Sequence, residues 1–239
     1  MPAKPAAWVV VPTYNEAETI EALVRAVRDL LPSDRRLLIV DDASPDGTGK
    51  IADRLADELG DVGVIHRPAK QGLGPAYRAG FGEALRGGAE LLVQMDADFS
   101  HDPADLASLI DAAGGADLVL GSRYVAGGRI LDWGPGRRAI SRWGSIYSRA
   151  VLGVGVRDLT TGFKCWHASA LRAIDPQSVR SEGYAFQVEM TYRAIRAGLR
   201  VVEVPITFRD RRVGESKMSR GIVLEAAWKV PSLRLRGWG

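Results

Sequence analysis

The chain has 239 residues, of which 46% are hydrophobic and 26% charged, the composition of a soluble globular protein with a substantial core. No run in the sequence reaches the roughly 20 apolar residues of a membrane-spanning helix, and the opening residues do not resemble a signal peptide. The single cysteine, Cys165, excludes an intrachain disulfide and fits a reducing cytoplasm. These features predict a cytoplasmic protein rather than a disulfide-stabilised secreted domain.

Charge is distributed unevenly along the chain. Residues 1–120 carry 11 Lys and Arg against 20 Asp and Glu, a net charge of −9, whereas residues 121–239 carry 21 against 9, a net charge of +12. The basic half indicates an anionic partner, and nucleic acid, a phosphorylated substrate and lipid headgroups all qualify. Because the basic residues come with tryptophans and without a recognisable nucleic-acid-binding motif, no nucleic-acid partner is expected.

Short apolar runs and amphipathic segments alternate along the first half of the chain. Each run has the length of a strand, and the segments between them carry apolar residues at helical spacing. The predicted strands are residues 8–11, 37–40, 62–65, 91–95 and 117–120. This alternation predicts an α/β fold in which helices cover both faces of a mostly parallel sheet.

The first predicted strand leads into a polar segment. Tyr14 and Glu16 follow at the open end of the sheet, where they are candidates for ligand binding. Asn15 is followed three residues later by Glu18, a pattern that resembles a capping box with Asn in place of Ser or Thr. We therefore expect Asn15 to cap the next helix rather than to act in catalysis.

The second predicted strand ends in the neighbouring carboxylates Asp41 and Asp42. Either Asp46 or Thr48 is expected to cap the helix that follows. Of the paired aspartates, we expect one to orient the turn and the other to bind a ligand hydroxyl. Parallel strands that deliver carboxylates to the same edge of the sheet indicate a ligand site there.

Gly72 and Gly74 superficially resemble a dinucleotide-binding fingerprint. The third glycine is missing, Pro75 interrupts the pattern, and no acidic residue stands about 20 positions later at a strand end. A nicotinamide site is therefore rejected in favour of a loop that leads into a helix.

The most informative stretch is the pair Asp96 and Asp98, which ends a buried-looking strand. Strand alternation places both carboxylates on the same side of the sheet edge, where open α/β folds bind ligands. Two hard oxygen ligands suit Mg²⁺ or Mn²⁺, which in turn would hold a diphosphate. His101 follows in the same loop, and two roles stay open for it, capping the next helix and touching a ligand.

The chain changes character after residue 124. A glycine-rich loop carries Arg129, Arg137 and Arg138, and apolar residues at positions 140, 143, 147 and 151 then repeat at helical spacing beside a basic stripe. Such a helix is typical of a membrane interface. An ordinary helix that packs on the sheet with a solvated basic edge explains the pattern equally well.

The remaining segments are a polar turn at 158–164, a helix at 184–197 and a strand at 201–208 that Pro205 interrupts. The loop at 210–217 carries three cations and is expected to fold over a diphosphate as a lid. The tail at 221–239 is apolar and basic, as in segments that lie on a membrane surface.

Several blocks together resemble one known family. They are Pro12–Glu16, Asp41–Thr48, Gly72–Tyr77, Met95–His101, Gly121–Tyr124 and Gly214–Ser219, in this order along nearly the whole chain. They resemble the polyprenyl-phosphate mannose synthases, which include the dolichol-phosphate mannose synthases, within the family-two glycosyltransferases of the GT-A fold. Asp158–Lys164, Val204–Phe208 and the Gly214–Lys217 loop point to the polyprenyl-phosphate branch.

The resemblance implies a Rossmann-like GT-A fold and a metal-dependent enzyme that uses Mg²⁺ or Mn²⁺. It also implies transfer of mannose from GDP-mannose to a polyprenyl monophosphate, with inversion at the anomeric carbon. The GT-A domain would cover residues 1–217, with a nucleotide-binding half up to about residue 124 and an acceptor-side half at 125–217. Residues 218–239 would form an amphipathic basic tail.

Members of this family also differ in how they reach the membrane. Some carry transmembrane helices and others rely on a partner subunit or domain. The resemblance therefore implies that this chain binds the cytoplasmic face of the membrane surface peripherally, or through a membrane-anchoring partner protein.

The resemblance assigns roles by position. GDP-mannose would contact Pro12, Tyr14, Glu16, Val40, Asp42, Asp96, Ala97, Asp98, Arg123, Arg211 and Lys217. Within this set, Asp96, Asp98 and Arg123 are the expected catalytic residues. Arg137 or Arg138 would receive the phosphate of the lipid acceptor.

The metal assignment implied by the resemblance is Asp98 together with Ser100. The family often has glutamine at the position of Ser100, and the shorter serine leaves direct, water-mediated and absent coordination all open. Three alternatives to the main function also stay open: a UDP-glucose:polyprenyl-phosphate glucosyltransferase, a transferase that uses a soluble acceptor, and a catalytically inactive nucleotide-sugar-binding module.

Overall fold

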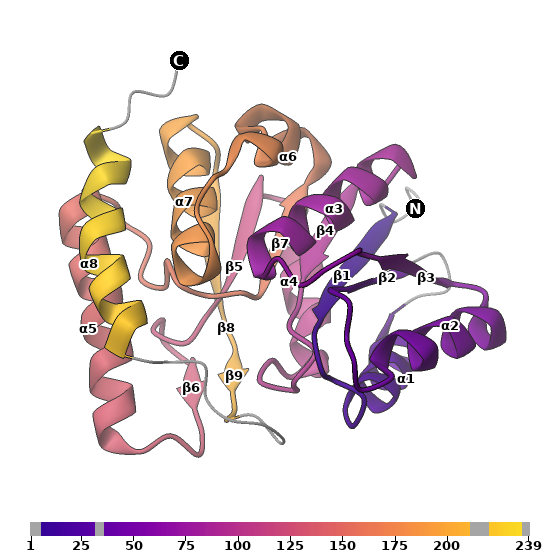
Figure 1. Cartoon of the computed structure of the whole chain (residues 1–239). Coiled ribbons are helices and arrows are strands. Elements are labelled where there is room, and N and C mark those ends of the chain that lie inside the picture. Colours follow the sequence, from indigo (N-terminus) through magenta and orange to yellow (C-terminus); the bar gives the residue numbers. More distant parts are fainter. Residues whose placement is uncertain (1–5, 32–35, 211–219, 236–239) are drawn as a thin grey trace.

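The computed structural model describes residues 6–31, 36–210 and 220–235, and residues 220–227 by their backbone alone. A seven-stranded sheet in the order β3-β2-β1-β4-β7-β5-β8 forms the centre of this part of the chain (Figure 1). Its strands are β1 (Ala7–Thr13), β2 (Arg36–Asp41), β3 (Val62–His66), β4 (Leu91–Gln94), β5 (Leu118–Ser122), β7 (Lys164–His167) and β8 (Val201–Pro205). Two short strands, β6 (Arg129–Ile130) and β9 (Thr207–Phe208), pair in parallel beside it.

The predicted α/β fold with a mostly parallel sheet is confirmed. Strands β3, β2, β1 and β4 pair in parallel, and so do β5 and β8. Strand β7 joins these two groups and is antiparallel to both of its neighbours. The sequence analysis did not predict β7, because Lys164–His167 is short and carries neither an apolar run nor a regular alternation.

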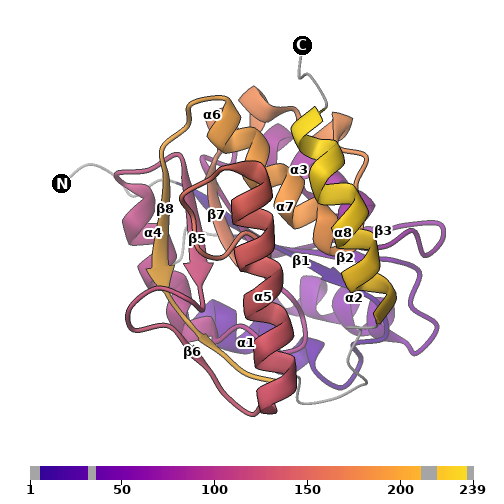
Figure 2. The ribbon, with the colours of Figure 1, turned by 90° about the vertical axis from the view of Figure 1, so that its left-hand side faces the viewer.

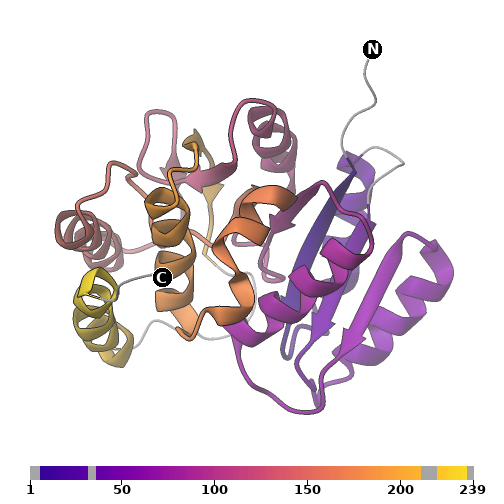
Figure 3. The ribbon, with the colours of Figure 1, turned by 90° about the horizontal axis from the view of Figure 1, so that it is seen from above.

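Helices cover both faces of the sheet. Along β1, Val9 and Val11 enter the core cluster on one face, whereas Trp8 and Val10 enter the cluster on the other, as strand alternation requires. The first face is covered by α1 (Ile20–Leu30), α2 (Thr48–Leu59) and α4 (Leu106–Ala113), and the second by α3 (Leu73–Arg86), α6 (Ala168–Ile174) and α7 (Gly183–Arg196). The view from above separates these two layers (Figure 3).

Two further helices, α5 (Pro135–Leu152) and α8 (Arg220–Leu235), lie side by side next to α7 (Figure 2). A separate apolar cluster joins these three helices and the turn before β7; its buried members are Leu152, Leu159, Val188, Tyr192, Val230 and Leu233. Among the described residues, no helix is both long and apolar enough to cross a membrane.

Two local expectations change. The capping prediction for Asn15 is wrong: α1 begins at Ile20 with Thr19 in the N-cap position, and Asn15 has a φ of 59° in the turn before it. Asparagine tolerates this left-handed backbone conformation, so the residue suits the turn before the helix. The strand predicted at 201–208 divides at Pro205, after which β9 leaves the large sheet to pair with β6.

Candidate active site

A pocket of about 460 Å³ opens at the carboxyl ends of the parallel strands. Residues that follow β1, β2, β3, β4 and β5 all reach it, which is the place where open α/β sheets bind ligands. The turn before β7, the first turn of α7 and the segment after β9 close its other side. Its lining includes Pro12, Tyr14, Glu16, Asp42, Lys70, Asp96, Ala97, Asp98, Ser100, His101, Arg123, Trp133, Arg137, Thr160, Glu182, Tyr184, Phe208 and Asp210.

The acidic pair lies at the floor of this pocket. Asp98 is buried, and its Oδ1 accepts a hydrogen bond from the backbone N–H of Ser100 at 3.0 Å. The Tyr77 hydroxyl donates to Asp96 Oδ1 at 3.4 Å. Burial raises the pKa of Tyr77 well above its ordinary value, and the Asp96 carboxylate adds to the shift, so the phenol stays protonated as a donor.

His101 contacts the backbone of Asp96 and does not cap the next helical turn. Its Nδ1 accepts from the backbone N–H of Asp96 at 3.4 Å, and its ring stacks on Phe163 with centroids 4.9 Å apart. Burial lowers the pKa of His101 despite the neighbouring carboxylates, so the neutral imidazole is favoured. The helical turn at Pro103–Asp105 is capped by Asp102, whose carboxylate accepts from the Ala104 amide at 3.0 Å.

The donor set fits a divalent cation that arrives with its substrate. Asp96, Asp98 and Ser100 line the pocket together, but the described residues contain no cluster of three or more His, Cys, Asp or Glu side chains that would form a cage. Mg²⁺ typically binds one or two carboxylates and keeps water or substrate phosphate as its other ligands. Two carboxylates at the pocket floor match that pattern.

The two aspartates at the end of β2 have different roles, and the role expected for one of them, orienting the turn, is found. Asp41 orients the turn: it accepts from the Thr13 hydroxyl at 3.2 Å and from the backbone N–H of Ser44 at 3.2 Å. Asp42 lines the pocket, but its carboxylate also accepts from the backbone N–H groups of Gln71 and Gly72, at 2.9 and 2.7 Å. Asp42 therefore fixes the loop after β3 to the pocket rim.

The capping prediction for the helix that follows this turn is wrong: Gly47 occupies the N-cap position of α2, without a side-chain cap. Asp46 Oδ1 accepts from the backbone N–H of Thr48, the first residue of α2, at 3.0 Å. Its Oδ2 accepts from the backbone N–H of Ala17 at 3.0 Å. Asp46 thus ties the start of α2 to the turn after β1.

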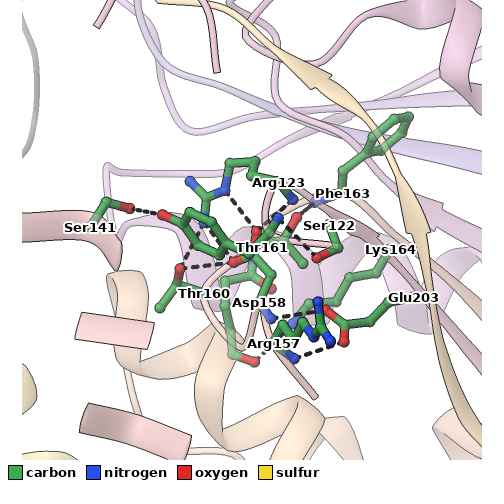
Figure 4. A network of polar contacts seen from close by, with 12 residues as sticks. Ser122, Arg123, Ser141, Arg157, Asp158, Thr160, Thr161, Phe163, Lys164 and Glu203 are labelled. Carbon is green, nitrogen blue, oxygen red and sulfur yellow. Dashed lines mark hydrogen bonds and ion pairs between the residues drawn. The ribbon is translucent and has the colours of Figure 1, made fainter. Parts of the chain in front are cut away.

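A buried ion pair supports the opposite wall (Figure 4). Arg123 Nε and Nη2 donate to the two carboxylate oxygens of Asp158, both at 2.7 Å, and Nη2 also donates to the Thr160 hydroxyl at 2.8 Å. Burial alone would raise the pKa of Asp158, but the Arg123 guanidinium holds it below its ordinary value. The backbone N–H groups of Arg157 and Asp158 donate hydrogen bonds to the carboxylate of Glu203 in β8.

Aromatic rings and a second arginine complete this wall. The Arg123 guanidinium lies 5.2 Å from the Phe208 ring centroid, and that of Arg137 lies 4.2 Å from the Trp133 ring centroid. Arg137 also forms an ion pair with Asp210 at 2.7 Å. The pocket lining thus contains two guanidinium groups, each paired with a carboxylate, together with Asp96 and Asp98.

The sequence model of "Glycosyl transferase family 2" matches residues 8–174, which span all of the strand-end motifs described above. The chain belongs to glycosyl transferase family 2. It is 51% identical over 221 residues to the undecaprenyl-phosphate mannosyltransferase of Micrococcus luteus, covering 92% of this chain and 90% of the relative. It is 48% identical over 231 residues to the polyprenol monophosphomannose synthase of Mycolicibacterium smegmatis, covering 96% and 87%.

The fold of this glycosyltransferase is also found in solved structures. A glucosyl-3-phosphoglycerate synthase from Mycobacterium tuberculosis, crystallised with phosphoglyceric acid, superposes with a TM-score of 0.73 at 18% identity, over 98% of this chain and 82% of that one. The same enzyme with Mn²⁺, UDP-glucose and phosphoglyceric acid gives a TM-score of 0.70 at 17% identity, over 98% and 81%. At such identities the likeness shows the GT-A fold.

The pocket of this glycosyltransferase contains most of the residues that the sequence analysis selected. Val40 does not line it, because its side chain is fully buried in the core next to α3. Arg138 is exposed and is also absent from the lining, unlike Arg137. Arg211 and Lys217 lie outside the described residues.

Several lining residues escaped the sequence analysis. Trp133 was not selected because an isolated aromatic residue carries no motif, Phe208 was used only as part of a strand that resembles the family, and Tyr184 was assigned only to a helix. Lys70 comes after the predicted strand at 62–65, and this position is the one signal that could have identified it. Asp158, which supports the wall without lining the pocket, belonged to a stretch that resembled the family, but it was not selected as a site residue because its role depends on Arg123, 35 residues away.

Proposed function

We propose that this glycosyltransferase transfers mannose from GDP-mannose to a polyprenyl monophosphate, with inversion at the anomeric carbon. The observation that carries the proposal is that Asp96, Asp98, Arg123 and Arg137 line one pocket. The names of the two relatives, which pair mannose with a phosphorylated polyprenol, support this choice of sugar and acceptor. The nucleotide lies against the strand ends that carry the acids, and the acceptor phosphate lies toward the arginines.

The acceptor needs no general base. A phosphate monoester is already largely ionised near neutral pH, because its second pKa is about 6. One of its oxygens attacks the anomeric carbon while the bond from that carbon to the nucleoside diphosphate breaks, and the diphosphate leaves with the electron pair. Arg123 and Arg137 then serve to hold the acceptor anion close to an anionic donor, against the Coulomb repulsion between them.

Asp96 and Asp98 would hold Mg²⁺ or Mn²⁺ in this proposal, and Ser100, which lines the same pocket, would be a further ligand. When bound there, the cation supplies positive charge to the departing diphosphate. The Asp98 carboxylate is already oriented by the Ser100 amide, so the protein does not have to reorganise when the donor arrives. Arg211 and Lys217 are assigned to the same diphosphate by the family resemblance alone.

The membrane surface is the proposed site of action, because the acceptor is a lipid. On α5, the side chains of Ile140, Trp143 and Ile146 are 49%, 58% and 53% exposed, and Arg138 and Arg142 are exposed beside them. An apolar stripe flanked by cations is the pattern of a helix that lies in a membrane interface. The first turn of the same helix carries Arg137 into the pocket.

The direct test is transfer of labelled mannose from GDP-mannose to a short polyprenyl phosphate in detergent, with Mg²⁺, Mn²⁺ or EDTA. Labelled lipid that forms with either metal and disappears with EDTA is the expected result. UDP-glucose in a parallel reaction tests the alternative donor. Binding of both nucleotide sugars without any transfer would contradict the proposal and favour an inactive binding module.

Membrane binding is tested by sedimentation with vesicles that contain anionic lipid. Trp143→Glu should reduce the bound fraction because it places a charge in the apolar stripe. Leu30→Glu is the matched control, since Leu30 is 47% exposed on α1, away from α5. Equal binding of both variants would remove α5 from the interface.

A further inference from the structure

Lys70 lies on the nucleotide side of the pocket, with its side chain over an aromatic ring. Its Nζ is 3.7 Å from the centroid of the Tyr14 ring, and both residues line the pocket. This is a close cation–π contact. It holds an ammonium group with three N–H donors beside a ring face on which a planar base can stack.

The loop that carries Lys70 is anchored to the sheet. Asp42 accepts hydrogen bonds from the backbone N–H groups of Gln71 and Gly72, the two residues after Lys70, at 2.9 and 2.7 Å. Asp42 also forms an ion pair with Arg67, three residues before Lys70, and both side chains of that pair are largely buried. Because the loop is held on both sides of Lys70, its ammonium is presented to the pocket from a fixed backbone.

The bases of nucleotide sugars offer different partners to an ammonium group. Guanine presents two adjacent acceptors, N7 and O6, on one edge. Adenine presents N7 beside an amino donor, which opposes a cation, and uracil has a single carbonyl acceptor on the corresponding edge. An ammonium at this position therefore favours guanine over both other bases.

We propose that Lys70 selects the base of the sugar donor by donating hydrogen bonds from Nζ to N7 and O6 of a guanine that stacks on Tyr14. The assignment rests on the proposed function, which makes GDP-mannose the donor. Lys70 leaves the ring face when the base arrives, and its flexible four-carbon stem lets the ammonium reach the base edge. Tyr14 then supplies affinity for any base, whereas Lys70 supplies discrimination.

The test is equilibrium binding of GDP, ADP and UDP to the full chain at fixed Mg²⁺ concentration, measured by calorimetry. Lys70→Met keeps the length of the side chain and removes its N–H donors. It should weaken GDP binding about tenfold and change ADP and UDP binding by less than about twofold. Lys50→Met is the matched control, because Lys50 is exposed on α2 and does not line the pocket.

A second ligand isolates the contact to the base. In 7-deaza-GDP a C–H group replaces N7, so the wild-type chain should bind it about three- to tenfold more weakly than GDP. The Lys70→Met variant should bind GDP and 7-deaza-GDP equally, because the donor that distinguishes them is gone.

The outcomes separate the two proposals. Equal weakening of GDP, ADP and UDP in Lys70→Met would place the lysine on the diphosphate and overturn its role in base selection. GDP binding with an unchanged preference over UDP in that variant would overturn the Lys70 assignment alone. Failure of the wild-type chain to bind GDP would overturn both the assignment and the GDP-mannose donor.

Discussion

The two sides of the pocket are held in place by different means. On the nucleotide side, the carboxylates of Asp41 and Asp98 follow strand ends and accept hydrogen bonds from backbone N–H groups two or three residues away. On the acceptor side, Arg123 pairs with Asp158 across 35 residues, and Arg137 pairs with Asp210 across 73. Both sides contain long-range contacts, but Asp41 and Asp98 also have local backbone donors, whereas each arginine pair joins segments far apart in the sequence.

This difference predicts which substitutions should lower activity and which should lower the stability of the fold. The Asp98 carboxylate accepts a hydrogen bond from the neutral Ser100 backbone N–H, whereas Asp42 forms an ion pair with the largely buried Arg67. A buried arginine that loses its only carboxylate partner keeps its charge in a poorly solvated place, which destabilises the fold strongly. A substitution at Asp98 should therefore lower activity in a folded protein, whereas a substitution at Asp158 should lower the free energy of unfolding.

The largest effect is expected for Asp98→Ala. Mannose transfer should fall by more than about a thousandfold, because the leaving diphosphate loses a carboxylate that holds its counter-charge. The melting temperature should stay within about 2 °C of the wild-type value. The matched control is Asp102→Ala in the same loop, which removes the cap at Ala104 but no pocket residue and should keep transfer within about twofold. Substantial transfer by the Asp98 variant would remove this residue from the chemistry.

Asp158→Ala should produce the largest loss of stability. The free energy of unfolding from urea titration should fall by about 3–5 kcal/mol, since Arg123 is left buried without its carboxylate. Thr160→Val removes only one hydrogen bond, from the Arg123 guanidinium to a neutral hydroxyl. It should lower the free energy of unfolding by about 1 kcal/mol. Similar losses in the two variants would show that the ion pair contributes no more than an ordinary hydrogen bond.

Lys164 should make stability depend on pH. Its Nζ is fully buried and donates to the Gln187 carbonyl at 2.8 Å, and burial lowers the pKa of Lys164 from 10.5 to about 7. Between pH 7 and pH 10.5 the unfolded chain therefore binds more protons than the folded chain, so stability rises with pH in that window.

Between pH 7 and pH 9 this rise should be about 2 kcal/mol in the wild type, and Lys164→Met should lack it. The measurement is the free energy of unfolding of both proteins at several pH values. If the free energy of unfolding changed with pH equally in the wild type and in Lys164→Met, Lys164 would have the same pKa in the folded and the unfolded chain. The result extends the comparison, because it tests a second buried cation whose hydrogen-bond partner, Gln187, lies 23 residues away.

The smallest effect distinguishes two neighbouring arginines. Arg137→Ala should raise the KM for polyprenyl phosphate about tenfold, with little change in the KM for GDP-mannose, because Arg137 reaches the pocket from the acceptor side. Arg138→Ala should change either KM by less than about twofold, since an exposed charge contributes little. Steady-state kinetics with varied lipid decide between them. A larger effect at Arg138 would move the acceptor phosphate to the outer face of α5.

The fold was predictable where neighbouring residues determine it. Apolar runs such as Val9–Val11 form strands because alternate side chains enter two cores, and that periodicity is visible in the sequence. Strand β7 was missed, because its place between β4 and β5 depends on pairing with distant segments. The cap at Asn15 was wrong for the same kind of reason: the turn after β1 is held by Thr48 and Asp46, about 30 residues away.

The candidate site was predictable on one side only. Asp96, Asp98 and Tyr14 could be selected because each follows a predicted strand, and parallel strands end at a common edge. Asp158, Trp133 and Phe208 could not, because their proximity to Arg123 is a property of the folded chain. The roles of Arg211 and Lys217 stay predictions.

The late position of β7 in the chain has a consequence for biosynthesis. Residues up to 94 can form four parallel strands as they leave the ribosome, but β4 then has an open edge that is covered only when Lys164–His167 arrives. An uncovered apolar edge is a template for pairing with another chain. At roughly 5–20 residues per second, this edge stays exposed for several seconds during translation. Nascent chains of intermediate length should therefore be the species most dependent on chaperones.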